Sequence, residues 1–257
     1  MFNSQTELDR LNSLTKYPSI DAYHKLGERG RLLPEVQVDF GASEAIMTEK
    51  VNGANGRIIL CPNGMYILGS REELLYAKGD LIIHGNPIDL AIIHTLKPIA
   101  ERLPTWSDRL TVVFGEVYGG TMGGKVAKQY TDSETTFGFR VFDYFSLADV
   151  SMHLSRPIEE IALWRTKGGQ SFASPEDIVA FAEGHKLEKV PVVGTGILPS
   201  SLEDTYALAK EKVYTSGCLL DASGKGRAEG MVVRTKDRTK IAKIRIEEYE
   251  RTLGIRG

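Results

Sequence analysis

The chain has 257 residues, of which 42% are hydrophobic and 26% charged, and its formal net charge is -2. This length can bury a sizeable core, in one large domain or two modest ones, and the composition is that of an ordinary globular protein. The nearly neutral charge balance excludes a bulk polycation, so any binding of nucleic acid must use a local basic surface.

Membrane and disulfide signals are missing from the sequence. No apolar run approaches the length of a membrane span, and the first residues show no signal-peptide pattern. The two cysteines, Cys61 and Cys218, lie far apart and suggest neither a disulfide framework nor a zinc site. We therefore expect a reducing, cytoplasmic location without membrane contact.

The N-terminal segment, residues 1–43, is expected to be helical. Residues 5–30 have helical spacing up to the breaker Gly27-Glu-Arg-Gly30. Pro18 interrupts this pattern, so two short helical pieces are predicted.

Residues 44–70 alternate like paired strands, with Pro62-Asn-Gly64 as a tight turn. Lys50 lies between an apolar approach and the turn-forming run Asn52–Gly56, at the rim between two strands. A lysine held there by the backbone can act as a covalent nucleophile if its neighbours lower its pKa. The alternative is a β-hairpin whose turn carries a solvated lysine.

The rest of the chain mixes helices and strands. Helices are predicted over 87–103, from the serine cap Ser174, and from the cap Ser201 to about 212. Strands are predicted over 110–117, 136–145, 190–193, 230–234 and 240–246. Without an internal repeat or a clear linker, this pattern predicts one α+β domain over residues 1–257. Its strands are mainly antiparallel with helices packed outside, and residues 246–257 form a short C-terminal tail with room for one short helix.

Five features follow one another along the chain. They are Lys50-Val-Asn-Gly53, Ser70-Arg71, Phe114-Gly-Glu116, Glu229-Gly-Met-Val-Val-Arg234 and Lys240-Ile-Ala-Lys243-Ile-Arg245. Each alone could be a surface charge, a strand end in solvent or a set of edge-strand lysines. Chance is a poor explanation for all five in this order.

The ordered set resembles the covalent nucleotidyltransferases, which are the DNA ligases, the RNA ligases and the mRNA capping enzymes, over about residues 44–250. The details are most similar to the RNA ligase 2 family, through Glu49–Asn55, Phe114-Gly-Glu116, Arg140-Val-Phe-Asp143 and Glu229-Gly-x-Val-x-Arg234. The resemblance implies a ligase-type adenylyltransferase domain of antiparallel sheets flanked by helices. Many relatives carry an OB or helical domain after the last motif, and none is obvious in this sequence.

The resemblance also implies a reaction in three steps with ATP and Mg²⁺ or Mn²⁺. A lysine takes AMP from ATP, the AMP moves to an RNA 5′-phosphate, and a 3′-OH then displaces it, as at a nick in duplex RNA. Two alternatives stay open. One is a DNA ligase or a GTP-dependent capping-type enzyme, and the other is a non-catalytic relative that binds nucleotide or nucleic acid.

In this resemblance Lys50 is the nucleophile. A free lysine has a pKa of about 10.4, and lowering it to about 7 needs on the order of 4 kcal/mol against the ammonium form. Lys243 and Arg245 are plausible neighbouring cations, because alternation puts both on one face of a strand. The family also places such cations on the α-phosphate, although it commonly has a second lysine where Arg245 stands. Glu229 resembles the acid that acts through metal-bound water.

Adenine needs a flat apolar slot and one polar group that reads its edge. By resemblance, Phe142 stacks on the base, Val232 closes the other face, and Glu49 accepts a hydrogen bond from the adenine amino group.

Four further residues are implied by the resemblance to bind the rest of the substrates. Glu116 resembles the acid that binds the ribose, and Arg71 and Asn55 resemble groups that position the phosphate and the 3′-OH end. Arg71 and Arg234 are the expected nucleic-acid contacts.

The glycine-rich loop after Glu116 carries Lys125, Lys128 and Tyr130. These residues could touch a phosphate backbone, but a mobile, solvated loop is the favoured interpretation.

Overall fold

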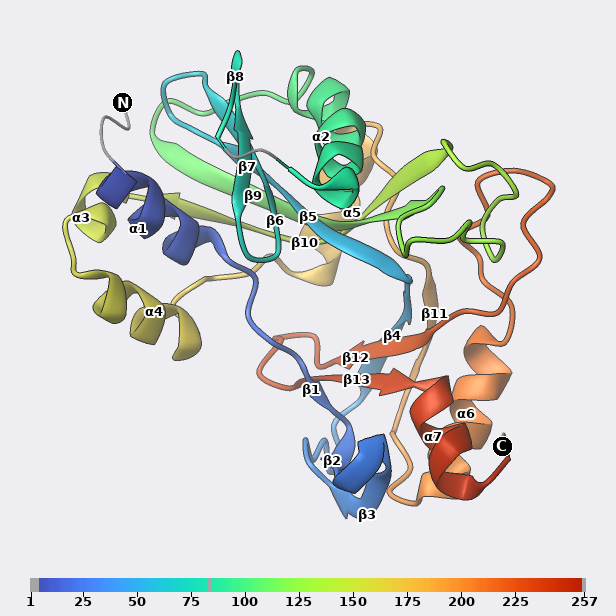
Figure 1. The fold of residues 1–257 in the computed structure, drawn as a ribbon. Coiled ribbons are helices and arrows are strands. Elements are labelled where there is room, and N and C mark those ends of the chain that lie inside the picture. The colour runs from blue at the N-terminus through green and yellow to red at the C-terminus, as the bar shows by residue number, and fades with distance from the viewer. Residues whose placement is uncertain (1–4, 83–84, 256–257) are drawn as a thin grey trace.

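The computed structural model describes residues 5–82 and 85–255, so the first four and last two residues of the predicted domain lie outside it. Two large sheets stand at an angle to each other, with helices on their outer faces (Figure 1). The expected α+β class with mainly antiparallel strands is confirmed. Only β1 and β13 pair in parallel among the described strands.

The six-stranded sheet has the spatial order β10-β9-β5-β6-β7-β8. Its strands are β5 (Gly53–Leu60), β6 (Tyr66–Ser70), β7 (Leu74–Ala77), β8 (Asp80–Leu81), β9 (Arg109–Gly119) and β10 (Phe137–Ala148). Both faces are covered, which explains why β5 and β9 read as continuous apolar runs. Ile58 and Leu60 pack toward the helices on one face, and Ile59 and Cys61 pack toward the other.

The five-stranded sheet has the order β1-β13-β12-β4-β11. Its strands are β1 (Asp21–Ala22), β4 (Ala45–Lys50), β11 (Val192–Gly196), β12 (Gly230–Arg234) and β13 (Ile241–Arg245). Every second residue, such as Met47, Val233 and Ile244, is buried against helices behind the sheet. The alternate residues face the other sheet.

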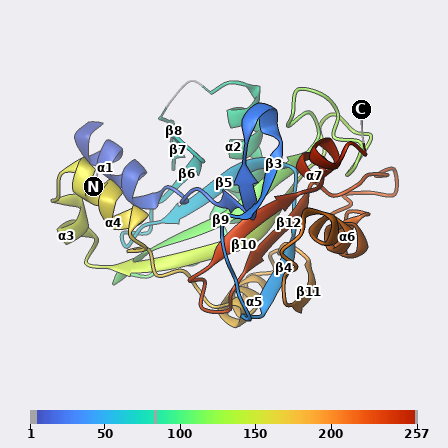
Figure 2. The same cartoon turned by 90° about the horizontal axis from the view of Figure 1, so that it is seen from below.

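Seven helices complete the described part of the chain. They are α1 (Gln5–Thr15), α2 (Pro87–Ala100), α3 (Val150–Leu154), α4 (Ile158–Thr166), α5 (Pro175–Gly184), α6 (Leu202–Val213) and α7 (Ile246–Leu253). α2 and α5 cover one face of the larger sheet, α1 and α3 lie over the other, and α6 and α7 back the smaller sheet (Figure 2). None of the described helices is long and apolar enough to cross a membrane.

A small hairpin lies beside α7. It consists of β2 (His24–Leu26), the 3-10 turn η1 (Glu28–Gly30) and β3 (Leu32–Val36). The amide of Leu32 donates to Thr252 Oγ1 at 2.8 Å, which fixes the hairpin to the last helix.

The predicted caps are confirmed. Ser174 and Ser201 accept hydrogen bonds from the amides of Asp177 and Asp204, and Pro87 stands in the first turn of its helix. The helices α3 and α4 were not predicted, because their short sequences lack a clear apolar stripe.

Two local predictions are wrong. Only residues 5–15 of the predicted N-terminal helical pieces are helical, because the chain after Pro18 pairs with β13 and the amide of Tyr23 donates to Lys243 O. The turn expected over Asn52–Gly56 does not form either, which also rules out the alternative of a hairpin around Lys50. The strands before and after it, β4 and β5, belong to different sheets, and Gly53–Gly56 continues as strand rather than turn.

Gly53 is tightly packed at this change of sheet. A Cβ added there would lie 2.2 Å from the carbonyl oxygen of Val117. We expect Gly53→Ala to lower the free energy of unfolding by about 1–3 kcal/mol, because backbone has to move. Urea unfolding measures it. Gly123→Ala, which would meet nothing within 4 Å, is the control and should change stability by less than about 0.5 kcal/mol. Equal stability of the two variants would contradict the close packing of Gly53 against the carbonyl oxygen of Val117.

Candidate active site

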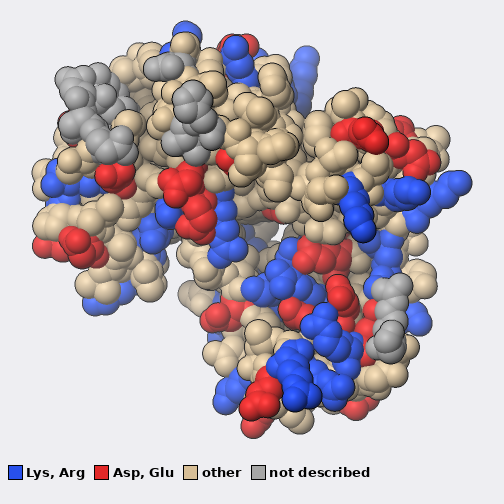
Figure 3. Space-filling view, viewed as in Figure 1, with Lys and Arg blue, Asp and Glu red and all other residues tan. Residues whose placement is uncertain are grey.

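A cleft of about 500 Å³ lies between the two sheets. It is visible as the hollow between the upper and lower lobes of the molecule (Figure 3). β4, β12 and β13 line it from one side, and β5, β9 and β10 from the other. The volume is in the range of small-molecule and cofactor sites.

Lys50 and Glu229 form an ion pair in this cleft. Lys50 ends β4, and Glu229 directly precedes β12, where Gly230 pairs with both Lys50 and Arg245. Lys50 Nζ lies 2.6 Å from one carboxylate oxygen of Glu229, and Arg245 Nε lies 3.0 Å from the other. Three neighbouring strands thus bring together three residues from separate motifs.

Lys243 stands on the same face as Arg245, with the buried Ile244 on the other face, as the alternation predicted. Burial, Arg245 and Lys50 lower the pKa of Lys243, while Glu248 opposes them. Its ammonium has no ion-pair partner among the described residues. It is therefore a half-buried cation that faces the cleft without a counter-ion.

Glu116 lies opposite on β9, where it pairs in register with Asn55. Burial raises the pKa of Glu116 from its ordinary 4.5 to about 7, and Glu229 adds to the shift, while Lys50 and an amide hydrogen bond from Gly53 oppose it. Asn55 Oδ1 is buried and has no hydrogen-bond partner within the described part of the chain. Glu116, whose carboxyl group resists ionisation, and Asn55, whose amide oxygen is unpaired, together indicate a binding site for a polar ligand.

Phe142 and Val232 face the cleft from opposite sheets. β10 is irregular between Val141 and Asp143, and this irregularity contains Phe142. The ring of Tyr17 packs edge-on against Phe142, with 5.1 Å between ring centroids. The arrangement leaves an apolar slot bounded by an aromatic ring.

Asp143 anchors a charged cluster behind Phe142. Its side chain is 1% exposed and accepts from Arg238 Nε at 2.9 Å and from Tyr17 Oη at 3.1 Å. Burial raises the pKa of Tyr17, so its hydroxyl stays a donor. Arg234 lies 3.7 Å from Asp143 and is 7% exposed, so it faces this cluster and offers little surface to a nucleic acid.

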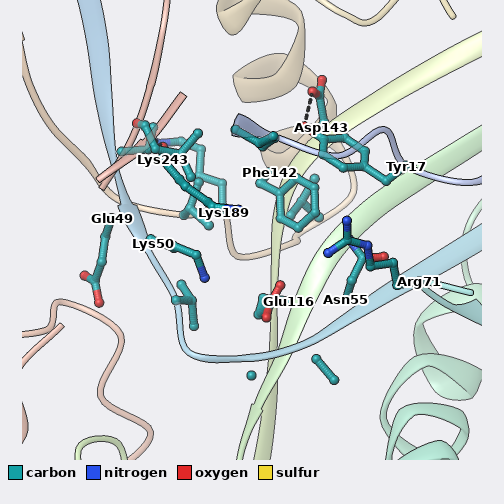
Figure 4. Close-up of a pocket in the computed structure, with 18 of the residues that line it drawn as sticks. Tyr17, Glu49, Lys50, Asn55, Arg71, Glu116, Phe142, Asp143, Lys189 and Lys243 are labelled. Carbon is teal, nitrogen blue, oxygen red and sulfur yellow. Dashed lines mark hydrogen bonds between the residues drawn. The ribbon is translucent and has the colours of Figure 1, made fainter. Parts of the chain in front are cut away.

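Glu49 points away from Lys50, because successive side chains of a strand alternate (Figure 4). Its buried carboxylate accepts from Ser216 Oγ at 2.5 Å and from the amide of Gly217 at 2.8 Å. A carboxylate has about four acceptor positions, so further capacity remains.

Arg71 stands at the rim of the cleft, with 54% of its side chain exposed. It donates to Ser19 Oγ at 2.8 Å and lies 3.5 Å from Glu72. All predicted site residues except Arg71 are therefore at least partly buried. All of them line one cleft except Glu229, which contacts the cleft residues Lys50 and Arg245.

A sequence model of the RNA ligase family matches residues 43–245. The chain belongs to the RNA ligase family. This match spans every predicted site residue.

Solved structures of the RNA ligase of Naegleria gruberi share the fold. A variant with ATP and manganese gives a TM-score of 0.56 at 12% identity and covers 93% of this chain and 58% of that chain. The enzyme with pyrophosphate gives 0.55 at 13%, and a variant with AMP and manganese gives the same values, each covering 95% and 59%. This chain thus spans less than two thirds of the length of these ligases. No curated protein matches it.

The sequence did not indicate two residues that line this RNA ligase cleft, Tyr17 and Lys189. The backbone of Lys189 forms an isolated β-bridge with Val141 of β10. Its side chain lines the cleft and is drawn near Lys50 and Lys243 in Figure 4. Its only signal was a charge directly before an apolar strand. Tyr17 had no signal, because its place depends on contacts with rings far along the chain.

The raised pKa of Glu116 predicts a pH-dependent cost of folding. Below pH 4.5 the carboxyl group is protonated in both the folded and the unfolded chain, so it does not lower the free energy of unfolding. Between pH 4.5 and 7 the unfolded chain ionises first, so stability falls by up to about 3 kcal/mol and then stays level. Glu116→Gln removes this titration.

The stability gained by Glu116→Gln over the wild type should therefore grow from pH 4.5 to 7 and then level off. Urea unfolding at several pH values measures it. A difference that does not vary with pH would contradict the shift.

Proposed function

We propose that the chain is an ATP-dependent RNA ligase that works through a lysyl-AMP intermediate on Lys50, with residues 1–257 forming one nucleotidyltransferase domain. The observation that carries the proposal is the meeting of Lys50, Glu229 and Arg245 in the cleft of an RNA ligase family member. ATP, AMP and pyrophosphate are named in the similar structures. ATP is the substrate and pyrophosphate a product of lysine adenylylation, and AMP is the group that the lysine carries and that the final joining step releases.

In the first step, the amine of Lys50 forms a bond from Nζ to the α-phosphorus of ATP. The bond from that phosphorus to the pyrophosphate oxygen breaks, and pyrophosphate leaves with the electron pair. The ammonium of Lys50 has to lose a proton first, because only the free amine is a nucleophile. The carboxylate of Glu229 holds the side chain in position at 2.6 Å.

Lys243 and Arg245 provide positive charge beside the nucleophile. The ammonium of Lys243 lacks a counter-ion among the described residues, so it can form an ion pair with a phosphate group of the substrate. Charge that develops on the α-phosphate in the transition state is stabilised most by cations fixed in a partly dry site. We assign this role to Lys243 first, since Arg245 already pairs with Glu229 and Glu248.

The slot between Phe142 and Val232 suits the adenine ring. The carboxylate of Glu49 now accepts hydrogen bonds from Ser216 and Gly217. By adding one hydrogen bond, or by exchanging one of these two, it can accept a hydrogen bond from the adenine amino group. This reader favours ATP over GTP, because guanine presents a carbonyl oxygen at that position.

Glu116 and Asn55 face the sugar and phosphates in this proposal. The unpaired Oδ1 of Asn55 can accept a hydrogen bond from a ribose hydroxyl, and the protonated form of Glu116 can donate one to a hydroxyl or phosphate oxygen. Arg71, exposed at the rim, is placed for the RNA ends, whereas the burial of Arg234 favours a role in holding Asp143.

A divalent metal fits the donor set. No group of three or more metal-ligating side chains exists among residues 5–82 and 85–255, so a dedicated protein cage is absent there. Mg²⁺ is usually held by one or two carboxylates together with substrate phosphates. Glu229, through water, is the carboxylate that would hold Mg²⁺ or Mn²⁺ together with the substrate phosphates, and the ion would neutralise charge on the phosphates.

The two later steps join RNA. An oxygen of an RNA 5′-phosphate attacks the phosphorus of lysyl-AMP, and the bond to Nζ breaks. The 3′-OH of the second strand then attacks the activated 5′-phosphate, losing its proton as AMP leaves. Nicked duplex RNA is the proposed substrate, because it holds the two ends together.

Lys50→Ala should abolish covalent labelling by α-labelled ATP, because no other amine takes its place beside Glu229. Denaturing gels measure the label, with Lys78→Ala, an exposed lysine at the far end of the larger sheet, as the control. Label that survives on Lys50→Ala would refute the nucleophile. Label from GTP instead of ATP would point to the capping-type alternative, and sealing only of DNA strands would point to a DNA ligase.

Phe142→Ala should raise the KM for ATP about fivefold or more, since stacking contributes about 1–3 kcal/mol per base. Phe142→Tyr keeps the ring and should stay within about twofold of the wild type. Labelling rates at varied ATP concentration measure both. Equal behaviour of the two variants would mean that Phe142 is only a packing residue.

A further inference from the structure

Two loops are joined on the edge of the molecule next to the cleft. Loop A is residues 120–136, between β9 and β10, and loop B is residues 214–228, between α6 and β12. The amide of Leu220 donates to Tyr130 O at 2.9 Å, and that of Lys225 donates to Lys128 O at 3.0 Å. Asp132 and Ser223 add a third link at 2.8 Å.

Tyr130 fixes this pair of loops to the chain segment directly after Lys50. Its ring is fully buried, so the expectation of a solvated loop is wrong at this residue. Its hydroxyl accepts a hydrogen bond of 2.7 Å from the amide of Asn52, two residues after Lys50. Val51, Val190 and Cys218 pack around the same ring. The loops are therefore built onto the floor of the cleft.

Charges are separated along the two loops. Lys125, Lys128 and Lys225 are exposed, and none of them forms a side-chain hydrogen bond or ion pair in the described ranges 5–82 and 85–255. The hydrogen bond from Lys225 to Lys128 O makes two of these lysines neighbours. Like charges this close repel each other, and a polyanion relieves the repulsion.

Two acidic residues of the loops are held within the loops: the carboxylate of Asp221 accepts hydrogen bonds from Thr131 and Ser223, and the amide of Asp132 donates to Ser223 Oγ. In Figure 3 the basic side chains on this edge gather beside the hollow between the lobes, and the acidic ones gather away from it. Arg227 is not available, because it pairs with Glu250.

We propose that Lys125, Lys128 and Lys225 form a binding surface for the phosphate backbone of the RNA duplex held in the cleft. The inference rests on the proposed function and adds how the substrate is gripped. Because the whole chain carries a net charge of -2, this local patch supplies attraction that the overall charge does not. Tyr130 keeps the patch at a fixed place relative to Lys50.

The test is the triple variant Lys125→Gln, Lys128→Gln, Lys225→Gln of the full chain. Binding of a fluorescent nicked RNA duplex is measured by anisotropy without ATP at several salt concentrations. The affinity should fall about tenfold or more, and the slope of log K against log salt should decrease by about 2–3, since each lost phosphate contact removes a little under one unit. Lysyl-AMP formation should stay within about twofold of the wild type, because the lysines lie outside the nucleotide cleft.

The matched control is Lys25→Gln, Lys78→Gln, Lys167→Gln, which removes the same charge from exposed lysines outside these loops. An unchanged affinity and slope in the loop variant, or an equal loss in the control, would overturn the proposal. Binding without ATP does not depend on chemistry, so failure of lysyl-AMP formation in the wild type would count against the proposed function alone.

Discussion

The structure depends on a change of sheet at Val51 and Asn52. β4 ends at Lys50 in one sheet, and β5 begins at Gly53 in the other, so only two residues join them. Such a short connection keeps the end of β4 beside the start of β5, and the cleft lies between the two sheets that these strands belong to. It also holds Lys50 at the floor of the cleft, where β12 and β13 deliver Glu229 and Arg245.

The arrangement concentrates electrostatic cost where the chemistry is proposed. Glu229 is shared by two cations, while Lys243 has no ion-pair partner among the described residues and Glu116 resists ionisation. A site of this kind is less stable than a neutral core would be, and a charged ligand completes it. The hydrophobic layers behind both sheets provide the stability that this site lacks.

The sequence predicted most of the strand framework and the catalytic candidates, because motif residues on neighbouring strands need only correct pairing to meet. The turn expected after Lys50 was wrong, because turn-forming residues do not reveal whether the chain turns back or continues as a strand of another sheet. The position of Tyr17 could not be predicted, since it is fixed by Asp143 and Arg238 across the fold. The position of Lys189 could not be predicted either, because it depends on an isolated β-bridge between its backbone and Val141 of β10.

The bond between Arg238 and Asp143 has a consequence for the path of the nucleotide. Arg238 comes from the tip of the β12–β13 hairpin in one sheet, and Asp143 from β10 in the other, so the sheets are tied at that end. Arg71 lies at the rim and is exposed. In the proposed reaction, a cleft closed at one end would admit ATP with its base leading, and the pyrophosphate, as the trailing part, would depart while the AMP moiety stays in the cleft.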